Sequence, residues 1–127
     1  MTDATEIQTL LVNAVRELTG SRGAWRSRNA GRARVGARRA AGMAIRAWLL
    51  GTGASGYGSN FMHHLAGVAD DDQWPVELRE AAWRLSARGV PENGFEAPLP
   101  DPLEPATDAE RLIEWFRTLS EGGRPHD

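Results

Sequence analysis

The segment from about Asn29 to Leu50 constrains the fold more than any other, because it combines length, a high alanine content and a helical period. At about 100° per residue, small side chains occupy one side of this helix over successive turns. Such a side lets a neighbouring helix approach closely. We therefore expect the 29–50 helix to lie at the centre of a bundle. Its small side comprises Ala30, Ala33, Gly36, Ala37, Ala40, Ala41, Ala44 and Ala47, together with the larger Met43 and Trp48.

Apolar residues at helical spacing predict further helices on both sides of that segment. No segment alternates with a period of two for long enough to form a strand. A chain of 127 residues also fits one domain. We therefore predict an all-α fold, a four- to five-helix up-and-down bundle over residues 1–127. Its helices are expected at 1–20, 29–50, 59–69, 75–88 and 107–120, with a tail at 121–127.

Local signals set the predicted starts of these helices. Asp3 with Glu6, and Thr107 with Glu110, have the spacing of capping boxes. Pro75 occupies a position suited to the first turn of a helix.

Other signals interrupt the helices. Gly20 is expected to end the first helix, and the segment after it has no clear period. The glycine-rich stretch 51–58 predicts a loop, after which Ser59 or Asn60 can cap the short helix. Five prolines between residues 90 and 106 predict a long loop there.

Composition narrows the chemistry and the location. The chain has no cysteine, which excludes disulfides, cysteine-bound zinc and thiol catalysis. All 15 basic residues are arginine, so lysine-dependent chemistry is excluded as well. No apolar run approaches the roughly 20 residues that cross a bilayer, and the first residues do not resemble a secretion signal. We expect a cytoplasmic protein with no membrane contact and no cofactor.

Charge is divided unevenly along the chain. Residues 1–49 hold nine arginines against three acidic residues, whereas residues 50–127 hold six arginines against fourteen acidic residues. Four arginines, with Arg34 and Arg38 beside them, form a stripe opposite the small side of the 29–50 helix. Such a stripe can contact successive phosphates, or it can pair with the acidic half or with a partner subunit. The four candidate ligand-binding residues are Arg28, Arg32, Arg39 and Arg46.

Other polar groups are weaker candidates for a site. His63 and His64 are adjacent, so on a helix they point about 100° apart, and the sequence favours a place for one of them as a cap or in a helix interface. They remain the weak catalytic candidates. No metal site is expected, because the acidic run 70–72 lacks the spacing of a calcium loop. The GTGASG motif at 51–56 follows a helix rather than a strand, so it predicts a linker and not a dinucleotide site.

Five tryptophans, at positions 25, 48, 74, 83 and 115, are spread regularly along the chain. This spread argues against one aromatic cage, and we expect most of the tryptophans to be anchors in the core or at helix interfaces.

The order of elements from about residue 33 to 119 resembles the HEPN family of small helical bundles. The resemblance is carried by ARRAAGMAIRAWLL, SNFMHHL, VELREAAWRL and TDAERLIEWF. Ribonuclease members of that family use an arginine followed four to six residues later by a histidine, and this chain has no such pair. A related branch has an arginine in the turn where this chain has Asn93.

The resemblance therefore implies a HEPN-like homodimer without the nuclease motif, acting as a binding or regulatory module for a nucleotide, a nucleic acid or a protein. Two alternatives remain. One is a phosphodiester-cleaving enzyme with a non-standard site built from His63 or His64, the acidic run 70–72 and nearby arginines. The other is a structural protein whose alanine-rich face recruits another helix.

Overall fold

The computed structural model describes residues 4–86 and 104–122, and all regular structure within them is helical. The predicted all-α class is confirmed. The five helices are α1 (Ala4–Arg26), α2 (Ala30–Thr52), α3 (Phe61–Asp70), α4 (Val76–Ser86) and α5 (Pro105–Ser120).

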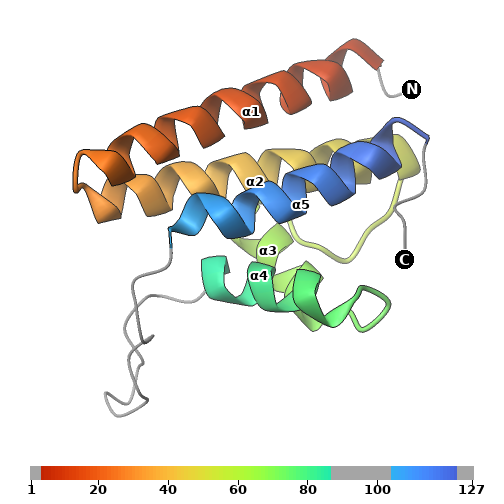
Figure 1. Ribbon diagram of the computed structural model, residues 1–127. Coiled ribbons are helices and arrows are strands. Elements are labelled where there is room, and N and C mark those ends of the chain that lie inside the picture. Colours follow the sequence, from red (N-terminus) through yellow and green to blue (C-terminus); the bar gives the residue numbers. More distant parts are fainter. Residues whose placement is uncertain (1–3, 87–103, 123–127) are drawn as a thin grey trace.

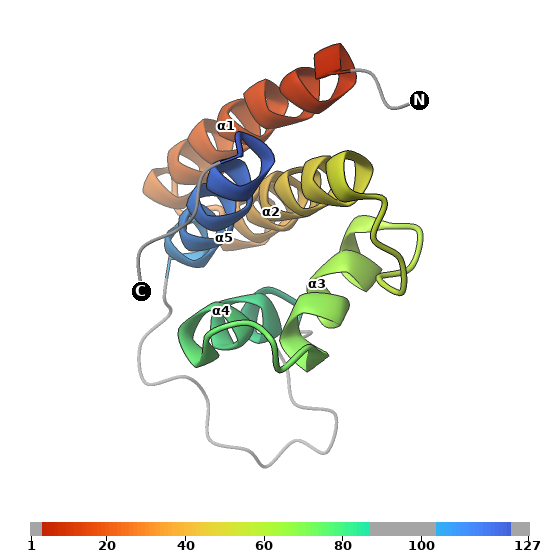
Figure 2. The same ribbon diagram turned by 90° about the vertical axis from the view of Figure 1, so that its right-hand side faces the viewer.

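Helix α2 lies at the centre and contacts each of the other four helices. Helix α1 runs antiparallel to it, and α5 lies beside both and runs in the same direction as α2 (Figure 1). The short helices α3 and α4 form a second layer on the side of α2 and α5 that faces away from α1 (Figures 1 and 2). The small side of α2 is the interface, as predicted, since its most enclosed alanines are 0% exposed: Ala33, Ala37, Ala40, Ala41, Ala44 and Ala47.

Helix α1 is longer than predicted, because it continues through Gly20 and ends at Arg26. The cause is tertiary packing. The Ser21 hydroxyl, which is buried, donates to the Ala33 carbonyl oxygen at 2.7 Å. A Cβ added to Gly36 would lie 3.3 Å from the Ser21 Cβ, so α1 and α2 are in close contact at this point. This contact holds α1 helical beyond the glycine.

Three other helix ends can be compared with their predicted positions: the end of α2 and the starts of α3 and α5. Helix α2 extends past Gly51 to Thr52, and it is capped by Gly53, whose φ of 71° is the left-handed conformation that suits glycine. Helix α3 is capped as predicted by Asn60, whose side chain accepts from the His63 backbone N–H at 2.8 Å. Helix α5 begins at Pro105 and not at Thr107, because the proline fits the first turn.

The remaining boundary predictions lie partly outside the described residues. The residues outside include Asp3, 87–103 and 123–127. The first predicted capping box, the end of the predicted 75–88 helix, most of the predicted long loop and most of the predicted tail therefore lie outside the described residues. No helix in the described ranges is long and apolar enough to span a membrane.

Three of the five tryptophans pack in or against the core, as predicted, whereas Trp83 on α4 is 61% exposed. Trp48 from α2, Trp74 from the turn before α4 and Trp115 from α5 gather in one aromatic cluster, because the turn folds back onto α2. The ring centroids of Trp48 and Trp74 are 5.3 Å apart, and those of Trp74 and Trp115 are 6.2 Å apart. Tyr57 and Phe116 complete the cluster. The cluster is a part of the core that links three elements.

The length of α1 gives the first testable prediction. Gly20 lies inside the helix with no atom within 4 Å of an added Cβ, so Gly20→Ala should stabilise the protein by about 0.5–1 kcal/mol. Urea unfolding measures this change. If α1 ended at Gly20 in a left-handed residue, the same substitution would lower the stability instead.

The opposite result is expected at Gly42. A Cβ added there would lie 2.4 Å from the Phe61 Cβ, so Gly42→Ala must push α3 away from α2. We expect a loss of about 1–3 kcal/mol in urea unfolding. If Gly42→Ala left the stability unchanged or raised it, as Gly20→Ala is expected to do, this result would contradict the close packing of α3 on α2.

Candidate functional site

The arginine stripe is divided among three places in the structure. Arg28 lies in the turn between α1 and α2, where it is exposed and has a φ of 63°. Arg32 and Arg39 line a groove beside α1. Arg46 points into the contact between α2 and α3. The four predicted residues therefore do not form one continuous face.

The groove between the second half of α1 and the first half of α2, here called the α1–α2 groove, has a volume of about 610 Å³. Arg16 from α1 joins Arg32 and Arg39 around it, a residue that the sequence pattern on α2 had not indicated. The groove is roomy because glycines occupy several lining positions. Its other lining residues are Glu17, Gly20, Ser21, Gly23, Ala24, Ser27, Asn29, Val35 and Gly36.

The α1–α2 groove is positively charged. Its lining contains three arginines and one acidic residue, Glu17. Glu17 Oε2 lies 3.6 Å from Arg39 Nη2, and both side chains are substantially exposed, so this ion pair contributes little. In the described part of the chain, Arg16 and Arg32 have no ion-pair partner. Two guanidinium groups are therefore available to an anionic ligand.

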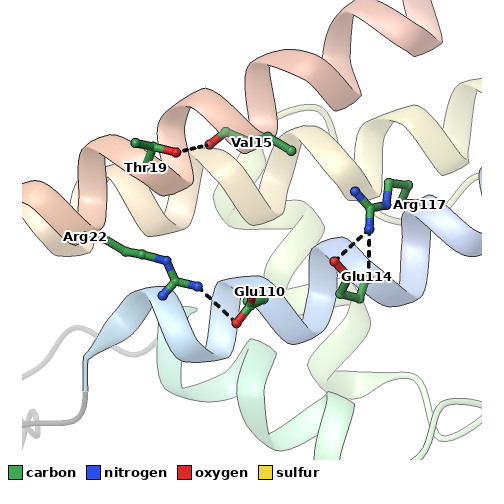
Figure 3. Close-up of polar contacts among 6 residues, drawn as sticks. All are labelled: Val15, Thr19, Arg22, Glu110, Glu114 and Arg117. Carbon is green, nitrogen blue, oxygen red and sulfur yellow. Dashed lines mark hydrogen bonds and ion pairs between the residues drawn. The ribbon is translucent and has the colours of Figure 1, made fainter.

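Arginines outside the stripe make the contacts with the acidic half. Arg22 on α1 reaches Glu110 on α5 at 3.0 Å (Figure 3). Arg117 pairs with Glu114 on its own helix. Arg84 on α4 binds both carboxylate oxygens of the buried Asp108 on α5, at 2.8 and 2.9 Å. None of the four stripe arginines pairs with an acid of the second half within the described residues.

His64 is buried between α2 and α3, with a side chain that is 3% exposed. Its Nδ1 lies 2.8 Å from the Tyr57 carbonyl oxygen, and Arg46 Nε donates to its Nε2 at 3.3 Å. These partners require the neutral ring with the proton on Nδ1. Burial lowers the pKa of His64, and the nearby charges of Arg46 and His63 act in the same direction, against the backbone hydrogen bond to Tyr57.

The other predicted polar candidates do not join His64. His63 is exposed and packs over Gly58. Asp71 accepts hydrogen bonds from the Tyr57 hydroxyl and from Gln73. No group of three or more potential metal ligands occurs among the described residues. The structure therefore does not bring the histidines and the acidic run into one site.

Tyr57 was not indicated by the sequence, although it organises the loop before α3. Its hydroxyl donates to Asp71 and accepts from Trp74 Nε1, the latter at 2.8 Å. Burial, together with the bond to Asp71, raises the pKa of Tyr57 to about 12. The same hydrogen bond lowers the pKa of Asp71. The only signal available was the presence of the single tyrosine of the chain within a glycine-rich loop.

The buried His64 predicts a pH dependence of stability. Because its pKa is lower in the folded state than in the unfolded chain, unfolded molecules bind more protons below pH about 6.5. The contribution of His64 to the free energy of unfolding should be fully present above that pH. It should decline as the pH falls toward the folded-state pKa, by at most about 1.4 kcal/mol per pH unit. His64→Asn should flatten the dependence between pH 7 and 5, whereas the exposed control His63→Asn should keep it. Equal slopes in the two variants would contradict this assignment.

Comparisons with protein-family models, with curated proteins and with solved structures found no match for this chain. The resemblance to the HEPN family stays a prediction from the sequence pattern.

Proposed function

We propose that this protein is a non-catalytic binding module that holds the phosphate groups of a nucleotide or a nucleic acid in the α1–α2 groove. The observation that carries the proposal is the presence of Arg16 and Arg32 in that groove without ion-pair partners in the described residues. A volume of about 610 Å³ is in the range of small-ligand sites.

The chemistry of the lining fits phosphate. Guanidinium groups donate forked hydrogen bonds to phosphate oxygens. Arg32 and Arg39 are seven residues apart on α2, about 10.5 Å along the helix axis. Arg16 approaches from the other wall. Hydroxyl and amide groups of Ser27 and Asn29 add neutral hydrogen-bonding partners. This arrangement suits a ligand with more than one phosphate or with sugar hydroxyls.

A phosphodiester-cleaving enzyme is less well supported. The contact between Arg46 and His64 does place an arginine beside a histidine, although their spacing in the sequence did not predict it. Both ring nitrogens of His64 are engaged, however, and the ring is almost fully buried. A general base needs a free nitrogen within reach of the substrate.

The homodimer implied by the resemblance belongs to the same proposal. The most exposed large apolar side chains in the described residues include Trp83 at 61% and Val76 at 50%, both on α4. They lie seven residues apart and therefore on one face of the helix. Light scattering of the purified protein distinguishes a dimer from a monomer. A cytoplasmic location and a protein partner remain predictions of the sequence.

Binding experiments can test the groove directly. We expect a labelled 12-nucleotide single-stranded RNA to bind at low salt. A parallel titration with AMP tests whether one nucleotide is sufficient for binding. Changing Arg16, Arg32 and Arg39 together to glutamine should weaken RNA binding at least tenfold. It should also reduce the slope of log K against log salt by about two, because each lost phosphate contact to a single strand removes about 0.7.

The matched control is Arg111→Gln, which removes an exposed arginine of α5 outside the groove. Its affinity should stay within a factor of two or three of the unaltered protein. No binding of either ligand at low salt, or equal losses in the triple variant and the control, would contradict the proposal.

A further inference from the structure

A second hollow lies at the other end of α2. It is an open pocket of about 340 Å³ between the last turns of α2, residues 54–59 and the start of α3, here called the loop pocket. Its volume is near the lower end of small-ligand sites. The loop pocket shares no lining residue with the α1–α2 groove, so it can be tested independently.

Arg46 is fixed at the edge of this pocket by three neutral partners. Its Nε donates to His64 Nε2 at 3.3 Å, and its Nη2 donates to the Ser59 carbonyl oxygen at 3.0 Å. The guanidinium carbon lies 4.4 Å from the centroid of the Phe61 ring. Two of its five N–H groups are used in these bonds, which leaves three donors in a fixed orientation.

The charge of Arg46 is not balanced locally. Among the ten residues that line the loop pocket none is acidic, and His64 is neutral there. In the described residues Arg46 has no ion-pair partner. A half-buried guanidinium group without a counterion favours an anion at its free edge.

The rest of the wall is largely apolar. Leu49 and Leu50 from α2 line the pocket next to Arg46, and Tyr57 lines it from the loop. An inorganic ion would leave these leucines in contact with water. A ligand with an aliphatic part would cover them and gain about 25 cal/mol for each Å² of apolar surface buried.

We propose that the loop pocket is a second binding site, which takes a small organic anion with a carboxylate or phosphate head group and a short aliphatic body. The head group binds the free edge of Arg46. The aliphatic body lies against Leu49 and Leu50. This site does not depend on the function proposed for the α1–α2 groove.

Titration of the ¹⁵N-labelled protein followed by NMR can test the proposal, with hexanoate, hexyl phosphate, inorganic phosphate and hexylamine as probes. We expect saturable shifts of the amides of residues 54–59 with hexanoate, with hexyl phosphate or with both, and the arm that binds identifies the head group. Inorganic phosphate should bind at least tenfold more weakly than the better of the two, and hexylamine should cause no shift.

Two variants and a control locate the binding. Arg46→Gln should weaken the better probe at least tenfold. Because this change also removes the bonds to His64 and Ser59, Leu50→Glu provides a second variant that places a negative charge on the wall and leaves those bonds intact. It should weaken binding to a similar extent, whereas Arg39→Gln should leave it unchanged. Absence of saturable shifts with both hexyl probes, equal affinity for inorganic phosphate, or unchanged binding in both variants would overturn the proposal.

Discussion

The close approach of other helices to the small side chains of α2 is the contact on which the rest of this structure depends. On one flank, Gly36 and Ser21 bring the axes of α1 and α2 together. On another, Gly42 allows Phe61 of α3 to lie directly against the backbone of α2. Larger residues at either position would separate the helices. The α1–α2 groove is lined by Ser21 and Gly36 of the first contact. The loop pocket is linked to the second contact through its lining residue Arg46, which packs over the Phe61 ring.

Charge is also distributed unevenly between the sides of the bundle. Helix α5 carries acids toward its neighbours, where Glu110 meets Arg22 and Asp108 meets Arg84. The pairing of Arg84 with the buried Asp108 uses both carboxylate oxygens, which makes it the geometrically strongest ion pair among the described residues. The open flank of α1 and α2 has only Glu17 among the groove residues to balance its three arginines. Of these two pairs, Arg22 with Glu110 is the one that joins the basic first half of the chain to the acidic second half, and the lining of the α1–α2 groove keeps a net positive charge.

Much of the fold could be predicted from the sequence, because small residues at helical spacing identify a central helix whatever packs against it. The cap at Asn60 was also predictable, because it depends only on that side chain and on the first turn of the helix that follows. The predicted helix end at Gly20 shows where inference from neighbouring residues fails. The hydrogen bond from Ser21 to Ala33, which holds α1 helical there, spans 12 residues, and no local sequence pattern indicates it. The gathering of three tryptophans in one cluster shows the same limit. Trp74 reaches Trp48 only because the turn before α4 folds back onto α2.

The candidate site was predictable in part. The sequence identified Arg32 and Arg39 but could not show that α1 adds Arg16, nor that α3 draws Arg46 away to His64. Phosphate binding in the α1–α2 groove is tested most directly by following the ¹H–¹⁵N signals of arginine side-chain Nε groups during titration with single-stranded RNA. We expect the signals of Arg16, Arg32 and Arg39 to shift together and saturate while that of Arg111 stays in place. Shifts confined to arginines outside the groove would contradict the proposed site.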